Sequence, residues 1–424
     1  MGLMLQSLLG VIAIPLIAWL LCEDRRALTA GDAARTIVAG LGLQVAIVGA
    51  LLLVPGLREV FDLLGAGVEA LQAATSAGMQ LVFGYLAGGP PPFAVANAGN
   101  GFVLALHALP LILIVSVLSK LLYHWGILQR VVGGVAFVLR RVLGVSGSLG
   151  TTTAANIFVG MVEAPLFIKP YLGSMGRGAL FATMTAGMAS VAGTVMALYG
   201  VLLESKVPGA VGHIVAASIM SAPAALMISR LMVPNGFAEA SEGTAMFDEN
   251  APTSTIDAIA QGTTEGLKLL AYVVAMLVTV VALVALANLI LGGITGPLLG
   301  VKLTFERLLG WVAAPLAFLI GIPWSEAVAA GELIGVKTVL NEFVAYLRLG
   351  ASDDATLSPR SRTILTYALC GFANFGSLGI MTGGLIAMCP QRRADILSLG
   401  PRTLVSGTLA TLLTGAIVGA MTPG

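Results

Sequence analysis

The chain alternates between long apolar stretches and short polar segments. A bilayer crossing needs about 20 consecutive apolar residues, and eight stretches meet that requirement. They lie at residues 3–21, 33–55, 101–122, 178–203, 211–233, 268–293, 363–388 and 397–421. This pattern predicts an all-α integral membrane protein with about eight transmembrane helices and no soluble domain.

Composition excludes a water-soluble globule. Hydrophobic residues make up 57% of the 424 residues and charged residues 10%, against about 25% charged in ordinary soluble domains. The 53 glycines favour closely packed or interrupted membrane helices. The balance of 22 basic and 21 acidic residues provides no polybasic surface, so we expect no nucleic-acid partner. The three cysteines lack metal-ligand spacing, which argues against a zinc site or a disulfide framework.

Basic residues predict the orientation, because cytoplasmic loops carry an excess of Lys and Arg. The loops after the first, third, fifth and seventh spans are basic, which puts both termini on the outer side. The residues that support this are Arg25, Arg26, Arg35, Lys120, Arg130, Arg140, Arg141, Arg230, Arg392 and Arg393. The segment 347–362 disagrees, because it is external on this count yet carries Arg348, Arg360 and Arg362.

Two pairs of unusual segments lie between the spans. Residues 129–145 and 303–321 are amphipathic with basic side chains, as expected of helices that lie at the membrane interface. Each precedes an apolar stretch that contains a glutamate and a lysine, at 150–171 and 324–349. We interpret these stretches as re-entrant hairpins, whose irregular backbone is tolerated only against protein or a wet cavity.

The two halves of the chain repeat this order. The first hairpin is followed by TAGMASVAG (185–193) and the second by LCGFANFGS (369–377), which share a small-residue skeleton that would break a helix. The two blocks begin on opposite sides of the membrane, which is typical of inverted repeats in secondary transporters. The prediction divides the chain into scaffold spans with a first interfacial segment (1–128), a first repeat (129–234), a cytoplasmic loop with a long scaffold span (235–302) and a second repeat (303–424).

Two glutamates at membrane depth are the strongest functional candidates. Burying a carboxylate there costs at least about 2.5 to 3.5 kcal/mol, so the presence of Glu163 and Glu342 at this depth requires an explanation. One reading pairs them with Lys169 and Lys337 as structural ion pairs; the other has them accept hydrogen bonds from a polar solute. The polar residues Asn341, Asn374 and Ser377 join the helices or bind that solute, and Phe372 is core or a stacking platform.

Signatures of an enzyme are sparse. His107, His124 and His213 have no spacing for metal or nucleophilic chemistry. There is no phosphate-cradling glycine loop, so ATP hydrolysis within this chain is not expected. An ion gradient is then the remaining energy source.

The blocks GVKTVLNEFVAY (335–346) and GFANFGSLG (371–379) resemble the concentrative nucleoside transporter family. The similarity extends over residues 155–172 and 102–127, and the element order matches from end to end. The resemblance implies a bacterial member of this family: a multi-pass protein of the cell inner membrane and a homotrimer. A mobile part made of the hairpins and broken spans would carry nucleosides inward as an elevator, coupled to sodium or, in some members, to protons.

The same resemblance assigns roles to individual positions. Glu342, Asn374 and Ser377 would bond the ribose hydroxyls, Phe372 would pack on the nucleoside, and Asn341 would support the second hairpin tip. Met161, Val162, Glu163 and Val195 would lie near the base. The sodium ion would be held by Asn156, Val159, Ser190 and Val191.

One stretch departs from the family pattern, which often reads Gly-Gln-Thr-Glu or Gly-Gln-Ser-Glu. This chain reads Gly160-Met161-Val162-Glu163, so an amide and a hydroxyl are missing at the turn facing the base. A site without these groups cannot discriminate bases by the same hydrogen bonds. Ribose recognition is expected to be intact.

We favour sodium over protons because Asn156 and Ser190 keep the oxygen ligands that a hard cation prefers. Two other function classes were weighed. A gated pore or non-transporting receptor would need a continuous polar lining, and only isolated polar positions are visible. A membrane-embedded nucleoside hydrolase could use Glu163 and Glu342 as paired carboxylates, but other catalytic groups are lacking.

Overall fold

The computed structural model describes residues 2–53, 55–94, 103–237 and 251–422, and the elements in these ranges are all helices. Seven helices are long and apolar enough to cross a membrane, or eight if the bent pair Phe305–Leu319 and Trp324–Val339 counts as one. They match seven of the eight expected spans. The eighth, 363–388, is divided into α16 (Pro359–Ala368) and α17 (Phe375–Met388). Most of the expected cytoplasmic loop, residues 238–250, lies outside the described residues.

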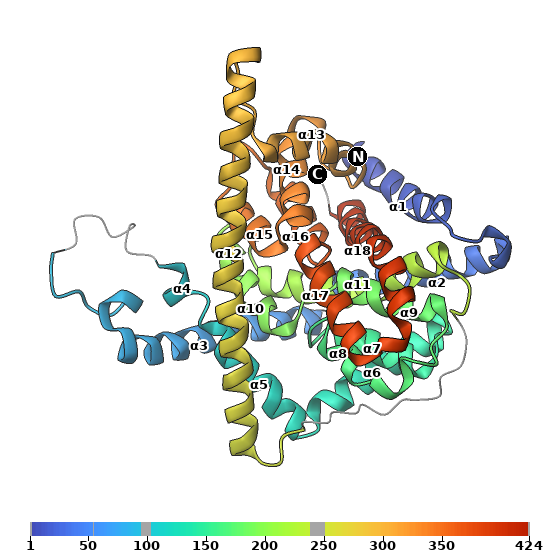
Figure 1. Cartoon of the computed structure of the whole chain (residues 1–424), viewed down its shortest axis with the longest axis horizontal. Coiled ribbons are helices and arrows are strands. Elements are labelled where there is room, and N and C mark those ends of the chain that lie inside the picture. Colours follow the sequence, from blue (N-terminus) through green and yellow to red (C-terminus); the bar gives the residue numbers. More distant parts are fainter. Residues whose placement is uncertain (1, 54, 95–102, 238–250, 423–424) are drawn as a thin grey trace.

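The N-terminal part contains α1 (Gly2–Leu20), α2 (Ala30–Leu53) and a long amphipathic helix, α3 (Pro55–Phe83). The hydropathy pattern did not identify α3, because charges at positions 58, 59, 62 and 69 interrupt its apolar residues. Helix α3 leads into η2 (Gly84–Ala87), and α4 (Leu104–His107) precedes α5 (Leu111–His124). In Figure 1, α3 and α4 project sideways from the main body.

Two sets of six helices repeat the same order: an interfacial helix, two hairpin helices, two halves of a broken span and a long final helix. The first set is α6 (Ile127–Leu143), α7 (Gly147–Asn156), α8 (Glu163–Leu166), α9 (Arg177–Ala189), α10 (Gly193–Leu203) and α11 (Ala210–Met232). The second is α13 (Phe305–Leu319), α14 (Trp324–Val339), α15 (Glu342–Gly350), α16, α17 and α18 (Arg393–Met421). Helices α6 and α7 lie at the end of the molecule opposite α13 and α14 (Figure 1). The hairpins, hairpin 1 (α7 and α8) and hairpin 2 (α14 and α15), therefore enter from opposite ends.

The two broken spans cross at their breaks. Helix α9 ends where Ser190 turns extended (φ −114°, ψ 169°), and the backbone N–H of Phe372 donates to the Ser190 carbonyl at 3.2 Å. This approach requires glycine at Gly371, because a Cβ there would lie 2.9 Å from the Ala189 carbonyl oxygen and 2.8 Å from Thr411. The interior of the molecule is therefore built around two interrupted helices rather than a continuous one.

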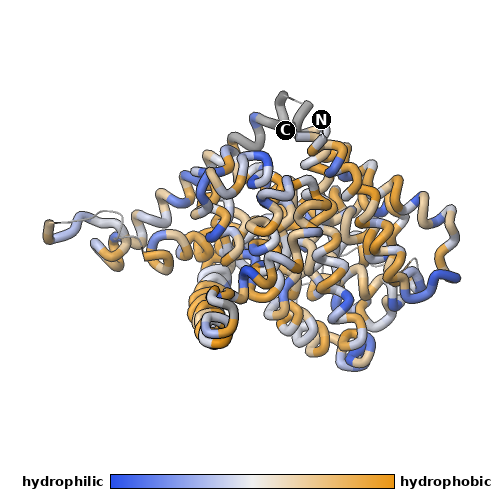
Figure 2. The backbone as a smooth tube through the Cα atoms, turned by 90° about the horizontal axis from the view of Figure 1, so that it is seen from above, coloured by the Kyte–Doolittle hydropathy of each residue, from blue (hydrophilic) through white to orange (hydrophobic). Residues whose placement is uncertain are grey.

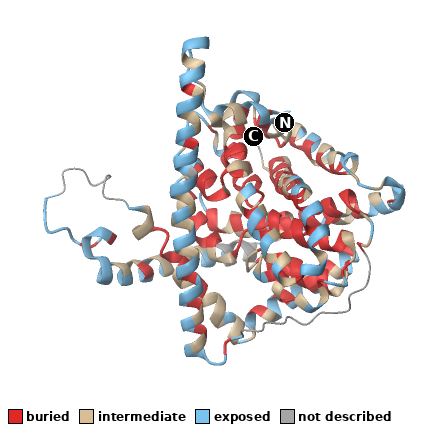
Figure 3. Cartoon of the chain, in the orientation of Figure 1, coloured by how far each residue is buried: buried red, intermediate tan, exposed pale blue. Residues whose placement is uncertain are grey.

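The helices of the two repeats are more buried than α12 (Thr255–Leu299), which forms a separate two-helix unit with α5. Helices α9, α11 and α18 are mostly buried, whereas α12, a 45-residue helix, is mostly exposed (Figure 3). Seen nearly end-on in Figure 2, α12 is hydrophobic around much of its circumference, as expected of a helix that faces apolar surroundings. Its partner is α5: a Cβ on Gly262 would lie 2.6 Å from Val117 Cα, and one on Gly266 3.0 Å from Leu113 Cα. Glycines four residues apart let the two helix backbones approach closely.

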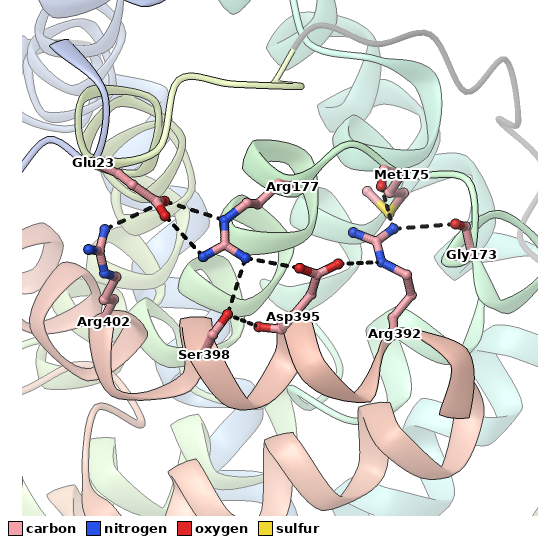
Figure 4. Close-up of polar contacts among 8 residues, drawn as sticks. All are labelled: Glu23, Gly173, Met175, Arg177, Arg392, Asp395, Ser398 and Arg402. Carbon is pink, nitrogen blue, oxygen red and sulfur yellow. Dashed lines mark hydrogen bonds and ion pairs between the residues drawn. The ribbon is translucent and has the colours of Figure 1, made fainter.

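An ion network joins three segments at one end of the molecule (Figure 4). Arg177, at the start of α9, bonds Glu23 after α1 at 3.1 Å and Asp395 in α18 at 2.9 Å. Arg392 also reaches Asp395, at 2.9 Å, and donates to the Met175 carbonyl. Because α1 packs on α18 and α11, and α2 packs on α11, the first two helices contact the repeats rather than the α5–α12 pair.

The basic segment 347–362, which disagreed with the charge pattern, has local partners for its arginines. Arg360 donates to the carbonyls of Gly321 and Gly419 and to Ser7 Oγ at 3.2 Å. Arg362 pairs with Asp354 at 2.7 Å and Arg348 with Glu306 at 2.9 Å. These charges cap helix ends and neutralise carboxylates, so they are a poor guide to the side of the membrane.

Candidate functional site

A cavity of about 750 Å³ lies between the hairpins, the broken spans and the α5–α12 pair. Its wall includes every residue that the sequence analysis assigned to the nucleoside. They are Met161, Val162, Glu163, Val195, Asn341, Glu342, Phe372, Asn374 and Ser377. Helices far apart in the sequence therefore bring the candidate residues to one place.

Glu342 is held firmly in this wall. It is 5% exposed, its Oε1 accepts a hydrogen bond from the Tyr199 hydroxyl at 2.8 Å, and its Oε2 accepts one from Asn374 Nδ2 at 3.1 Å. Each carboxylate oxygen can accept a second bond. Lys337 forms no ion pair with Glu342 among the described residues, since its Nζ donates to the Ala368 carbonyl and to Thr411 Oγ1. The simple ion-pair reading of Glu342 is therefore wrong.

The two asparagines are helix N-caps. Asn341 Oδ1 accepts from the Val344 N–H at 2.9 Å at the start of α15, and Asn374 Oδ1 accepts from the Ser377 N–H at 2.7 Å at the start of α17. These bonds satisfy N–H groups that a helix start leaves unpaired. The positive ends of two helix dipoles thus lie at the cavity, and they favour the negative charge of Glu342.

Glu163 occupies the corresponding place in hairpin 1, at the first residue of α8. Its side chain is exposed to the cavity and folds back over Gly160, where a Cβ would collide with its carboxylate. The apolar turn beside it is anchored: a Cβ on Gly187 would lie 2.9 Å from Met161 Cβ, and one on Gly384 3.1 Å from Val162 Cγ1. Met161 and Val162 therefore pack against α9 and α17 as well as lining the cavity.

The α5–α12 pair supplies a wall that the sequence analysis missed. Lys120, Glu265, Lys268 and Tyr272 line the cavity, and Lys120 Nζ lies 2.9 Å from Glu265 Oε1. Charged residues at the ends of apolar spans were the available signal, but the sequence analysis considered only Lys120, and only for the orientation of the chain. Tyr199 was also missed, because an aromatic residue inside an apolar helix gives no sign of its hydrogen bond.

The candidate ion ligands lie behind hairpin 1, where α7 and α9 both end. The Phe158 carbonyl at the hairpin tip accepts from the Gly193 N–H at 3.0 Å, which joins the tip to the break that contains Ser190 and Val191. Asn156 is 1% exposed, and among the described residues neither its Oδ1 nor its Nδ2 has a hydrogen-bond partner. Buried polar groups are nearly always paired, so this amide needs a ligand.

Other polar atoms nearby support that reading. Ser190 Oγ donates to the Ala186 carbonyl at 2.9 Å, which leaves its lone pairs able to accept or to coordinate. The buried hydroxyls of Thr152 and Thr183, one helical turn before Asn156 and Gly187, also lack a hydrogen-bond partner in the ranges that the structure describes. The negative dipole ends of α7 and α9 meet here, and a set of neutral oxygens at such a place fits a hard monovalent cation. Of the four candidates, Val159 also lines the cavity, whereas Asn156, Ser190 and Val191 lie behind its wall.

Comparison with protein-family models gives three consecutive matches. Residues 9–86 match the Na+ dependent nucleoside transporter N-terminus, residues 105–206 match a nucleoside recognition (Gate) domain, and residues 213–419 match the Na+ dependent nucleoside transporter C-terminus. Together these matches run through the two repeats and the helices that precede them.

Relatives match over nearly the whole chain. The uncharacterized transporter YutK of Bacillus subtilis is 41% identical, covering 98% of each chain, and the nucleoside permease NupC of Helicobacter pylori is 38% identical, covering 98% of this chain and 97% of its own. A solved structure described as CNTnw in an inward-facing substrate-bound state superimposes with a TM-score of 0.86 at 38% identity, covering 99% of this chain and 97% of that one. A variant of CNTnw in an outward-facing state gives 0.88 at 37% identity, with the same coverage. With this identity over its full length, the chain belongs to the concentrative nucleoside transporter family.

Proposed function

We propose that this protein imports nucleosides by symport with sodium. The observation that carries the proposal is the fixing of Glu342 between Tyr199 and Asn374 at the wall of the cavity, together with the Asn156 amide behind the opposite hairpin, which has no hydrogen-bond partner among the described residues. The first arrangement offers a preoriented acceptor to a polar solute, and the second offers oxygens to a cation.

The ribose is the part of the substrate that suits Glu342. A carboxylate whose two oxygens each accept one protein hydrogen bond keeps lone pairs for two neighbouring hydroxyls, and hydrogen bonds to a charged group are strong. Asn374 and Ser377 stand beside it in the cavity wall. Because every ribonucleoside carries the same two neighbouring ribose hydroxyls, this end would serve all ribonucleosides.

The base would lie toward hairpin 1, between apolar side chains and Glu163. Met161, Val162, Val195 and Phe372 line that side and offer a planar ring dispersion contacts and stacking. Without an amide or hydroxyl at Met161 and Val162, few directional bonds distinguish one base from another. We therefore propose that Glu163, directly or through water, supplies the main polar contact to the base.

Coupling between ion and nucleoside has a short structural route. The Ser190 carbonyl, beside the proposed ion ligands, accepts the Phe372 N–H at 3.2 Å, and Phe372 lines the cavity. An ion that orders the break between α9 and α10 would also fix Phe372, so the second ligand would bind a site already ordered.

For alternating access, the repeats would move as an elevator against the α5–α12 pair. The cavity lies between these two parts, because it is lined by α5 and α12 on one side and by the hairpins on the other. We also propose a homotrimer in the cell inner membrane with both termini on the outer side. The exposed apolar surface of α12, which includes Val278, Leu289 and Leu298, is available for other chains and for lipid.

Uptake into proteoliposomes tests the proposal. Radiolabelled uridine and adenosine should accumulate under an inward sodium gradient and not under an inward proton gradient of equal size. Uptake driven by protons alone would reject sodium and keep nucleoside symport. Binding without uptake under either gradient would favour a receptor, and release of free base would favour a hydrolase.

The ion site has its own prediction. Asn156→Ala should lower the sodium affinity by roughly tenfold or more, because a coordinating oxygen is lost in a buried site. Nucleoside binding would then need a higher sodium concentration. The measurement is a sodium titration of nucleoside binding to the purified protein. Asn235→Ala, which removes an exposed amide bonded to Asp24, is the control and should leave the titration unchanged. Parental sodium dependence in Asn156→Ala would contradict the proposed ligand set.

A further inference from the structure

Hairpin 2 contains a buried cation of its own. Lys337, in the last turn of α14, is 1% exposed, and its ammonium donates to the carbonyl of Ala368 at 3.0 Å and to Thr411 Oγ1 at 2.8 Å. Ala368 is the last residue of α16. The charge therefore lies where two half-helices, α14 and α16, both end.

The end of α16 is fully provided with donors. The carbonyl of Thr366 accepts from the Tyr346 hydroxyl at 2.7 Å, that of Tyr367 from the Cys370 N–H at 3.2 Å, and that of Ala368 from Lys337. Helix ends leave such carbonyls unpaired unless side chains, water or ligands reach them. In repeat two, two side chains and one backbone N–H of the protein perform this task.

The equivalent place in repeat one is built differently. There the half-helices α7 and α9 end together, neither helix contains a lysine, and the buried Asn156 amide has no hydrogen-bond partner within the described part of the chain. The same helix-end geometry, with its two negative dipole ends, thus occurs twice. One copy contains a covalently attached ammonium, and the other contains unpaired oxygens.

We propose that Lys337 is the fixed cation of repeat two, occupying the position at which repeat one takes up sodium, so that each chain binds a single sodium ion. This inference rests on the proposed sodium symport. The ammonium neutralises the negative dipole ends of α14 and α16, and its bond to the Ala368 carbonyl joins it to α16. Hairpin 2 is consequently kept ordered in every ionic condition, and only hairpin 1 responds to sodium.

A purely structural lysine would make a different prediction. If Lys337 served only as a hydrogen-bond donor, a neutral donor of similar length would replace it, because glutamine can also reach a carbonyl and a hydroxyl. If its positive charge is what matters, glutamine leaves two helix ends without a counter-charge in a buried place. The charge and the donor can therefore be separated by substitution.

The experiment measures nucleoside affinity and melting temperature of purified variants in sodium, methylammonium or choline chloride at constant ionic strength. For the parent we expect a Hill coefficient for sodium of about 1. Lys337→Ala opens space for an ion, so it should lose nucleoside affinity by roughly tenfold or more in choline. In methylammonium, the nucleoside affinity of Lys337→Ala should rise to that of the parent in choline. In sodium, its Hill coefficient for sodium should approach about 2.

Two further variants make the outcome decisive. Lys337→Gln should lose affinity in all three salts, whereas Lys206→Ala, which removes an exposed lysine paired with Asp354, should keep the nucleoside affinity of the parent in each salt. Parental affinity in Lys337→Gln would overturn the proposal, as would a folded Lys337→Ala that ignores methylammonium and keeps a Hill coefficient of about 1. If Lys337→Ala does not fold, Lys337→Gln still decides. If the parent shows no sodium dependence, sodium symport fails, but methylammonium rescue of the melting temperature still tests the fixed cation.

Discussion

The two glutamates of the cavity occupy equivalent places in the two hairpins, but they differ in burial and in hydrogen bonding. Each lies in the first turn of the second helix of its hairpin, Glu342 in α15 and Glu163 in α8. Glu342 is 5% exposed and accepts hydrogen bonds from Tyr199 and Asn374. Glu163 is exposed to the cavity beside the apolar residues Met161 and Val162.

This difference shows how one fold can combine a strict and a permissive half-site. A carboxylate fixed by protein donors presents its remaining lone pairs in set directions, so little entropy is lost when a ligand binds. A carboxylate that faces the cavity without a donor from a neighbouring helix, as Glu163 does within the described part of the chain, can follow ligands of different shape, at the cost of ordering it each time. The strict half lies in repeat two and the permissive half in repeat one.

The largest effect should come from removing the charge of the fixed carboxylate. We expect Glu342→Gln to weaken binding of every nucleoside by roughly 1.5 to 3 kcal/mol or more, because hydrogen bonds to a charged group are lost and buried polar partners are left unsatisfied. Calorimetry or a thermal-shift titration with uridine and adenosine measures it. The control is Asn288→Gln, which alters a polar side chain that donates a hydrogen bond to Glu306 and should leave nucleoside affinity unchanged. Unchanged affinity would remove the basis for the strict half-site.

A smaller, uniform effect should follow from loosening the same group. Tyr199→Phe deletes the hydroxyl that donates to Glu342 Oε1 at 2.8 Å and keeps the aromatic ring. We expect affinity to fall by about 1 kcal/mol for purine and pyrimidine nucleosides alike. Equilibrium binding to a panel of nucleosides provides the measurement. A loss confined to one base class would mean that Tyr199 acts at the base and not through Glu342.

Glu163→Gln should change affinity by an amount that depends on the base. Gln retains an acceptor and adds a donor, so some bases should lose roughly 0.5 to 1.5 kcal/mol of binding and others little. The same panel measures it, and the spread between bases is the informative quantity. An equal loss for all nucleosides, as large as that of Glu342→Gln, would make the two half-sites equivalent.

The smallest effect concerns the outer anchor of hairpin 2. Asp354 accepts bonds from Lys206 at 3.0 Å and Arg362 at 2.7 Å, and these partners hold the pKa of its carboxyl below the ordinary value, Lys206 being the larger cause. A lowered folded-state pKa adds stability that is complete above the ordinary aspartate pKa and is lost as the pH falls through the folded-state pKa. Asp354→Asn should therefore lower the melting temperature slightly near neutral pH.

The difference between Asp354→Asn and the parent should shrink below about pH 4. Melting curves recorded between neutral and acidic pH measure this difference. A gap that widens as the pH falls would have the wrong sign. Because Asp354 is largely exposed and water screens its charge, a small shift is expected, and nucleoside affinity should not change.

The hydropathy pattern predicted the spans well because membrane helices can be identified in a sequence by their length and apolar composition. The exception was α3, whose charges lie within an amphipathic helix and lower its average hydropathy. The breaks after Ser190 and before Asn374 were expected from small residues, but their crossing through the Phe372 N–H was not, because contacts between distant segments leave no local signal.

For the candidate site, the sequence motifs led to the residues but not to their partners. Glu342 was singled out for its charge, yet its donor Tyr199 lies 143 positions away on another helix. The short sequence separation of Lys337 and Glu342 made an ion pair one of two interpretations of this glutamate. The helix turns Lys337 toward Ala368 and Thr411 instead, which depends on side-chain direction along α14.

The capping by Arg360 has a consequence for the order in which the molecule assembles. Its guanidinium bonds Leu3 and Ser7, 357 and 353 positions away, together with the carbonyls of Gly321 and Gly419. Contacts of such long sequence separation form slowly, because chain entropy must be lost before they are made. During biogenesis, the guanidinium of Arg360 therefore lacks these acceptors until α1, α13 and α18 have packed around α16. We expect this contact to form late in folding.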